Sequence, residues 1–138
     1  MAEQTRLEIV SPTRLLLSEP VDLAEIPATE GYIGVLAGHA PMIVTLRGGL
    51  IRVHQGGSVT RELYVGGGFA EIAPDRCTVL ADEAIPAAEL SVETARERIA
   101  EAEKAYAEAA ETRDGLVIER AMAKLLAARA MEEAAGRR

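Results

Sequence analysis

The sequence has few of the side chains from which catalytic and metal sites are built. Among its 138 residues are one cysteine, Cys77, and two histidines, His39 and His54. A single cysteine excludes an internal disulfide and fits a reducing compartment, so we expect Cys77 to be a buried structural thiol. Neither histidine stands at ligand spacing from the other or from the cysteine. The sequence therefore predicts no metal site and no cofactor.

Long apolar runs and an excess of basic residues are also missing. The longest run without a charged residue, 31–46, is shorter than the roughly 20 apolar residues of a membrane-spanning helix, and it contains one proline and three glycines. The start of the chain is polar and no apolar segment follows it, which predicts that there is no signal peptide. The net charge of -7 argues against a nucleic-acid-binding protein.

Composition and charge divide the chain into two parts. Apolar residues make up 49% and charged residues 27% of the chain, as in globular proteins. Residues 1–90 hold 12 acidic against 6 basic side chains, whereas residues 91–138 hold 10 against 9. The apolar period changes at nearly the same place. We therefore expect a sheet domain over residues 1–86 and a helical domain over residues 87–138.

The first domain has the alternation of short strands. Leu7 and Ile9 alternate with Arg6 and Glu8, as expected of a strand with one buried face. Further short apolar runs follow, separated by segments with glycine and proline. This pattern is typical of an antiparallel β-sandwich, here with about ten short strands. The candidate strands cover residues 5–10, 14–17, 21–26, 32–36, 42–46, 50–55, 59–65, 69–73 and 77–81.

Three groups of glycines are expected to form turns between the longer strands. The triplet of Gly66, Gly67 and Gly68 is not a phosphate-binding loop, because no helix N-terminus and no Lys-Ser/Thr pair follows it. A tight bend or a close approach of two backbones explains it better. The other two groups are Gly48 with Gly49 and Gly56 with Gly57.

The charges on either side of Gly56 and Gly57 predict the register of the hairpin that turns there. A two-residue turn would place Arg52 opposite Arg61, which is an unfavourable pair of like charges. A loop of odd length instead sets Arg52 against Glu62 and Ile51 against Leu63. We predict this second register, because it pairs opposite charges and apolar side chains.

From Ser91 onward the apolar residues recur with the period of a helix. Ser91 is a good N-cap, and residues 111–115 interrupt the pattern before a second helix begins. Two helices joined by so few residues form an antiparallel hairpin. Alanine dominates its inner faces and buries less area than Leu or Ile, so we expect a weak attachment to the sheet domain. The two apolar faces consist of Val92, Ala95, Ile99, Ala102, Tyr106 and Ala109, and of Ile118, Ala121, Met122, Leu125 and Ala128.

No group of residues in the sequence has the composition of a catalytic site. His54 precedes a glycine turn, and we expect it to be an exposed residue at a strand end. His39 lies in a turn with Gly38 and Pro41, where local hydrogen bonds are the expected role of its ring. The acidic residues are scattered singly, without a converging pair. The sequence therefore predicts a protein that is not an enzyme.

The segment EGYIGVLAGHAP at residues 30–41 and three shorter segments carry a resemblance to a known family. The shorter segments are Val10-Ser11-Pro12, Gly66-Gly67-Gly68-Phe69 with Glu71-Ile72, and Thr78-Val79-Leu80-Ala81-Asp82. Together they resemble the epsilon subunit of F-type ATP synthase, whose mitochondrial equivalent is called delta. The resemblance covers essentially the whole chain, including the helical hairpin.

The resemblance implies a non-catalytic subunit of the rotor, or central stalk, on the cytoplasmic face of a bacterial inner membrane. In this family the sandwich binds the gamma subunit and rests on the ring of c subunits, so residues 30–41 are implied to meet the ring and the foot of gamma. A glycine-rich surface with little charge suits such a contact, because backbones approach closely and few charges lose water. A loop that serves only its own fold is the alternative. The implied contact residues are Glu30, Gly31, Tyr32, Ile33, Gly34, Gly38, His39 and Pro41.

The resemblance also implies that the hairpin is a regulatory element. In the family it lies against the sandwich in one state. In another it extends along gamma towards the alpha and beta subunits, where it opposes ATP hydrolysis. A weakly attached hairpin agrees with two states of similar free energy. Arg113, Arg120 and Lys124 lie on one predicted helical stripe, which either meets an acidic surface of beta or is a solvated face.

Two points leave other interpretations open. Many relatives have an acidic or other polar residue where this chain has Tyr32, which puts the polarity of the implied contact with the ring in question. A freestanding ligand- or peptide-binding sandwich with the hairpin as its lid is the alternative function. An enzyme that uses His39 is a more remote third.

A further departure from the family predicts weak or absent ATP binding by the isolated subunit. Some bacterial members bind ATP in the hairpin through an aliphatic-Asp-x-x-Arg-Ala motif at the start of the first helix. Here Ser91 replaces the aspartate, Thr94 replaces the arginine, and Glu93 repels phosphate. We expect titration calorimetry to detect no binding in the micromolar range. A micromolar dissociation constant would contradict this.

Overall fold

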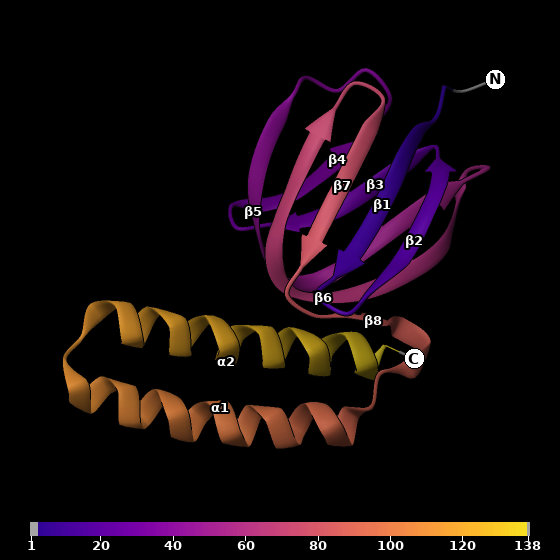
Figure 1. Ribbon diagram of the computed structural model, residues 1–138. Helices are drawn as coiled ribbons and strands as arrows, with labels where there is room; N and C mark the ends of the chain where they lie inside the picture. Colours follow the sequence, from indigo (N-terminus) through magenta and orange to yellow (C-terminus); the bar gives the residue numbers. More distant parts are fainter. Residues whose placement is uncertain (1–2, 138) are drawn as a thin grey trace.

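The computed structural model describes residues 3–137, which form a sheet part followed by two long helices. The helices are antiparallel and lie along one end of the sheet part (Figure 1). The fold class predicted from the sequence is confirmed. The elements are β1 (Thr5–Ser11), β2 (Arg14–Val21), β3 (Leu23–Ala28), β4 (Gly31–Val35), β5 (Met42–Gln55), β6 (Ser58–Ala73), β7 (Arg76–Ala81), β8 (Ala84–Pro86), the 3-10 turn η1 (Ala87–Glu89), α1 (Val92–Thr112) and α2 (Gly115–Gly136).

One hydrogen-bonded sheet folds over itself to make the sandwich. Its strands follow the order β2-β1-β7-β6-β5-β3-β4, and β8 pairs with β6. All pairs are antiparallel except β1 with β7, which is parallel. The long strands β5 and β6 curve strongly, so the two halves of the sheet face each other (Figure 1). The described chain therefore has eight strands, not ten.

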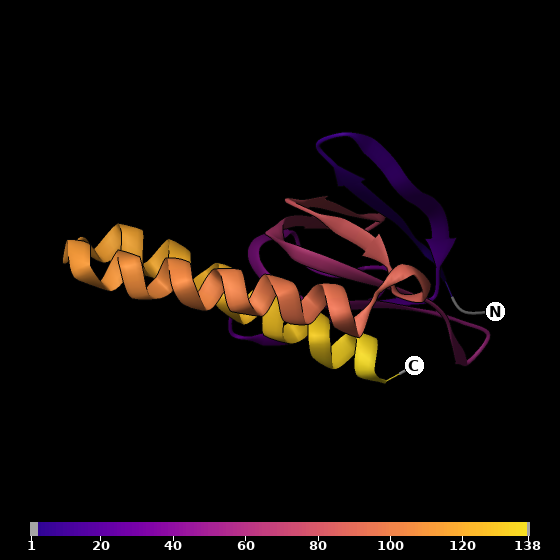
Figure 2. The same cartoon turned by 90° about the horizontal axis from the view of Figure 1, so that it is seen from below.

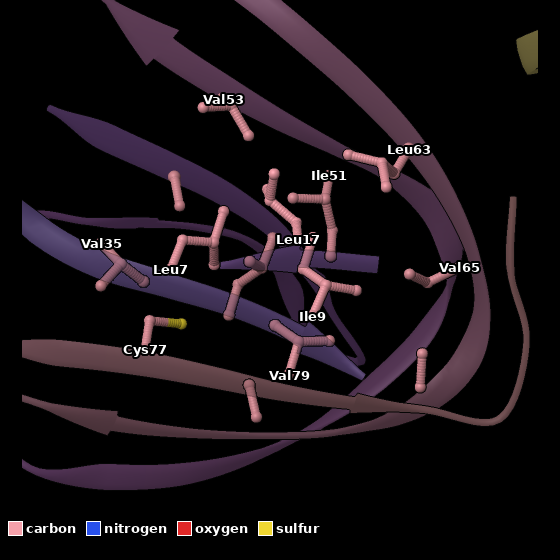
Figure 3. Packing of buried hydrophobic residues seen from close by; sticks show 14 of the residues in the cluster. Leu7, Ile9, Leu17, Val35, Ile51, Val53, Leu63, Val65, Cys77 and Val79 are labelled. Carbon is pink, nitrogen blue, oxygen red and sulfur yellow. The ribbon is translucent and has the colours of Figure 1, made fainter. Parts of the chain in front are cut away.

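The apolar side chains between the two halves form the main core. Leu7 and Ile9 of β1 point inward with no exposed surface, together with Ile51 and Val53 of β5, as Figure 3 shows. Cys77 lies in the same core and is fully buried, which confirms the expected structural thiol. Burial raises the pKa of its thiol to about 11, so the sulfur stays protonated and unreactive at neutral pH.

The predicted turns at Gly48 and at residues 66–68 are wrong. Gly48 lies inside β5 and Gly66 inside β6, and the two residues pair with each other. A strand can bend at a glycine because no side chain resists the bend. Two pairs of predicted strands therefore merge into β5 and β6, and the short strand β8 was not foreseen. The second interpretation of the triplet is confirmed, because a Cβ at Gly68 would collide with the Leu80 carbonyl.

The predicted register of the β5–β6 hairpin is confirmed. Arg52 pairs with Glu62, and Arg52 Nε lies 3.1 Å from Glu62 Oε2. The register arises differently from the expectation, since the turn has two residues, Gly56 and Gly57, both with positive φ. An irregularity in the pairing next to Val53 supplies the shift of one residue.

The two helices begin as their sequences predict. The Ser91 side chain accepts a hydrogen bond from Thr94 N, and Asp114 caps α2 through Leu116 N and Val117 N. The predicted inner faces are the sides of lowest exposure, with Ala95 and Ala109 buried on α1 and Leu125 and Ala128 buried on α2. The half of the hairpin that carries the α1–α2 turn extends beyond the sheet part (Figures 1 and 2).

The bend in β6 predicts that Gly68 tolerates no side chain. In Gly68→Ala the alanine would have to adopt φ 123°, which is unfavourable for a residue with a Cβ, and this Cβ would clash with Leu80. The substitution should lower the free energy of unfolding by about 3 kcal/mol. Gly57→Ala is the matched control, since Gly57 also has positive φ but nothing within 4 Å of a Cβ. We expect a loss of about 1 kcal/mol for it in urea unfolding. Equal losses for the two variants would refute the clash.

Candidate interaction surfaces

Residues 30–35 of the predicted contact segment lie at the edge of the sheet. β4 is the terminal strand of the sheet order and pairs only with β3. Glu30, Tyr32 and Gly34 are exposed, Ile33 packs against the core, and Val35 is fully buried. The segment is therefore anchored by its apolar residues and presents a side with little charge to the outside.

Tyr32 is partly occupied by contacts within the chain. Its ring lies 5.0 Å beneath the Arg47 guanidinium, a cation–π arrangement. A small hollow of about 130 Å³ next to this pair is lined also by Leu50 and by Glu133 and Arg137 of the last turns of α2. The edge of the sheet and the end of the hairpin are thus neighbours at Tyr32.

The second half of the segment is a loop held by its own hydrogen bonds. Gly38 has φ 83°, and its N–H donates to the Pro74 carbonyl at 2.6 Å. His39 N donates to Leu36 O, and the His39 ring Nδ1 lies 2.7 Å from Ala40 O. This confirms that His39 makes local hydrogen bonds. Pro41 ends the loop as an exposed residue.

A row of apolar side chains crosses the outer face of the sheet, and the sequence alone does not predict it. Leu15, Val10, Leu80 and Phe69 are neighbours in that order across β2, β1, β7 and β6. Leu15 is 59%, Leu80 38% and Phe69 46% exposed, and Val10 is half-buried, whereas Val79 and Ala70 beside Leu80 and Phe69 are fully buried. We call these four residues the apolar row. Alternation along each strand gives the outward positions, but only the pairing shows that they join.

The remaining polar groups give no sign of catalysis. His54 is not the exposed residue predicted from the sequence: it is half-buried, and its Nε2 bonds to Glu25 Oε1 on the paired strand β3. The long sequence separation of these two residues hid the pair. Within residues 3–137 no three His, Cys, Asp or Glu side chains are placed to hold a metal ion.

The α2 helix contacts the sheet at one closely packed point. A Cβ at Gly48 would lie 2.6 Å from Ala127 Cα, so the helix backbone rests directly on β5. Beside it the Tyr64 hydroxyl donates to the Ala127 carbonyl at 2.9 Å. Tyr64 is 1% exposed, and burial together with the nearby Glu83 carboxylate raises its pKa to about 12, so the hydroxyl keeps its proton. Leu50 and Met131 pack around this point.

The α1 helix contacts the sheet part through an ion pair. Arg98 Nη1 and Nη2 donate to the two Glu83 carboxylate oxygens at 2.5 and 2.8 Å. The side-chain hydrogen bonds to Glu83 raise the pKa of Arg98. Glu83 follows β7, and its carbonyl accepts a hydrogen bond from Gly66 N of β6. The ion pair is therefore fixed to the same bent strand as Tyr64.

The three cations predicted to share a helical stripe do not do so. Arg113 has φ 58° and lies in the turn between the helices, so it belongs to neither helix. Arg120 and Lys124 lie one turn apart on α2 and line a cleft of about 600 Å³ between the helices and the sheet part. Acidic residues line the same cleft, namely Asp82, Glu83 and Glu101. The cleft is thus of mixed charge.

The two residues that replace the ATP-binding motif residues in this chain do not reach this cleft. Ser91 and Thr94 are exposed, and they bond to each other through the helix cap. They are not among the residues that line it. The predicted weakness of ATP binding stays a prediction.

No helix within residues 3–137 has the length and apolarity that a membrane crossing requires. Residues 4–87 match the family model for the β-sandwich domain of the ATP synthase delta/epsilon chain. The chain is 59% identical to the ATP synthase epsilon chain of Granulibacter bethesdensis over 96% of this chain and 97% of that protein, and 48% identical to that of Rhodospirillum rubrum over 92% and 93%. It is also similar to a chain in the cryo-EM structure of the Euglena gracilis mitochondrial ATP synthase, OSCP/F1/c-ring. That match has a TM-score of 0.75 and 26% identity over 97% of this chain and 82% of the other.

Proposed function

The chain belongs to the ATP synthase delta/epsilon family, and from this membership we propose that its sheet part joins the gamma subunit to the ring of c subunits in the rotor. It is a non-catalytic subunit of the ATP synthase central stalk. The relatives support this role and give no support to a freestanding ligand-binding module. Docking on the rotor would make it a peripheral protein on the cytoplasmic face of a bacterial inner membrane.

The observation that carries the proposal is the exposed apolar row. Three exposed apolar side chains, joined by the half-buried Val10, mark a surface for another protein, because they lose contact with water only when a partner covers them. We assign this row to gamma. The loop with Gly38 and His39 is a second proposed contact with gamma, and its hydrogen bond to the turn at Pro74 fixes it to the same strand pair, β6 and β7, as the row.

We assign the β4 edge to the c-ring. Glu30, Gly31 and Gly34 leave the backbone accessible there, and Ile33 anchors the strand from behind. The Tyr32 ring adds an apolar surface held in place by Arg47. The contact proposed for this chain is therefore less polar than one with an acidic side chain at the same position.

We further propose that residues 87–138 form a regulatory domain distinct from the rotor-binding domain at 1–86. In the present state the hairpin lies against the sheet. In a second state it would extend along gamma to the alpha and beta subunits and oppose ATP hydrolysis. Its outer half extends beyond the sheet part, as Figure 2 shows, and carries Arg113 with exposed Leu116 and Val117. These residues, with Arg120 and Lys124, are the proposed contacts to alpha and beta.

Removal of the hairpin tests whether residues 1–86 bind the rotor and residues 87–138 regulate hydrolysis. In the whole complex, deletion of residues 90–138 should leave assembly and ATP synthesis in place, because the sheet part has its own core. The rate of ATP hydrolysis should rise, because the inhibiting segment is gone. An unchanged hydrolysis rate would contradict the regulatory role, and loss of assembly would contradict the assignment of rotor binding to residues 1–86.

A charge in the apolar row tests the contact with gamma. Phe69→Glu should weaken co-purification with gamma by more than about tenfold, because the carboxylate must lose water on docking. Val59→Glu is the matched control: Val59 is 45% exposed, against 46% for Phe69, but lies beside the β5–β6 turn, away from the row. Equal co-purification of both variants would refute the assignment.

A further inference from the structure

The hairpin packs on the sheet part through a small apolar cluster that includes Leu50 and Met131, and two specific points of contact on or beside β5 and β6 accompany this cluster. We propose that these two points, Gly48 and Tyr64 against Ala127 and Glu83 against Arg98, form a latch that holds the hairpin in its docked state and sets how readily it is released. This inference rests on the proposed regulatory function and names the device by which that regulation would act.

The first point depends on the absence of a side chain at Gly48. The α2 backbone comes so close that any Cβ there would overlap Ala127 Cα and Cβ, at 2.6 and 2.8 Å. This closeness brings the Ala127 carbonyl within reach of the Tyr64 hydroxyl. The carbonyl lies inside a helix and uses its second lone pair for this bond. Close packing and the hydrogen bond therefore depend on each other.

The second point holds the other helix. Both Arg98 nitrogens bond to Glu83, a geometry that fixes direction as well as distance. Tyr64 and Glu83 are tied together through β6, because Gly66 N donates to the Glu83 carbonyl two residues beyond Tyr64. The latch thus contacts both α1 and α2 from one hydrogen-bonded part of the sheet, around Tyr64, Gly66 and Glu83. The two helices should leave this part together.

Release uncovers apolar surface. Leu50 is 5% exposed, and Tyr64 and Met131 are each 1% exposed in the docked state. Opening of the latch brings these side chains into water, which opposes release until a partner covers them. The attachment therefore depends on a few specific contacts as well as on the alanine faces.

Oxidation of Met131 by hydrogen peroxide in the full-length chain measures release directly, because methionine oxidation follows exposure. Met42, which is 40% exposed on β5, is the internal reference. Gly48→Ala should raise the Met131 rate relative to Met42 by roughly tenfold or more, because the added methyl group forces α2 away. Tyr64→Phe should raise it about threefold to tenfold through loss of the hydrogen bond.

Gly115→Ala is the matched control, because a Cβ at Gly115 meets nothing within 4 Å. It should leave the Met131 rate unchanged. Alkylation of the buried Cys77 reports whether the sandwich stays folded. If Gly48→Ala exposes Cys77, then Tyr64→Phe is the deciding variant, since it removes one hydrogen bond to Ala127 and adds no atom between β5 and α2. Rates for Gly48→Ala and Tyr64→Phe equal to that of Gly115→Ala would overturn the latch.

The same variants separate the latch from the proposed function. Faster Met131 oxidation with no change in ATP hydrolysis by the assembled complex would support the latch and contradict the regulatory role. Unchanged oxidation with altered hydrolysis would contradict the latch and support that role.

Discussion

The paired glycines Gly48 and Gly66 are the constraint on which most of this structure depends. They lie opposite each other in the long strands β5 and β6. Because neither residue has a side chain, the double strand can turn its second half back over its first. The close contact of α2 with β5 depends on this place, because any side chain at Gly48 would overlap Ala127.

The bend also separates the surfaces of the molecule by role. On one side of it the sheet half with β1, β2 and β7 turns the apolar row outward. At the bend itself Tyr64 and Glu83 face the helices. The proposed function requires such a separation, since a surface that stays attached to gamma cannot also be the surface from which the hairpin is released. The packing shows the same division, with the main core inside the sandwich and a smaller apolar cluster under the hairpin.

Attachment of the hairpin illustrates how few contacts can govern a large element. Most buried residues of the two helices are alanines, which bury little area. In the proposed latch, specific contacts at Ala127 and Arg98 add to the small apolar cluster under the helices and help to set their position. An element held in this way can be stable where it lies and still be released by the loss of a few interactions.

Local patterns in the sequence determined a large part of this protein. The alternation of Leu7 and Ile9, the cap at Ser91 and the charges of Arg52 and Glu62 predicted β1, the start of α1 and one register, because these features depend on residues near one another along the chain. Recognition of the family rested on such short motifs too, and Cys77 was correctly expected to be buried.

Only the tertiary structure decided what depends on residues far apart in the sequence. In the sequence the pair Gly48-Gly49 predicts a turn, whereas in the structure Gly48 lies within β5, paired with Gly66 of β6. The apolar row, the bond of His54 to Glu25 and the seat of Ala127 on Gly48 likewise join separate segments. A sequence specifies such contacts only through the fold, because the distance between two side chains is set by strand pairing and packing and not by their spacing along the chain.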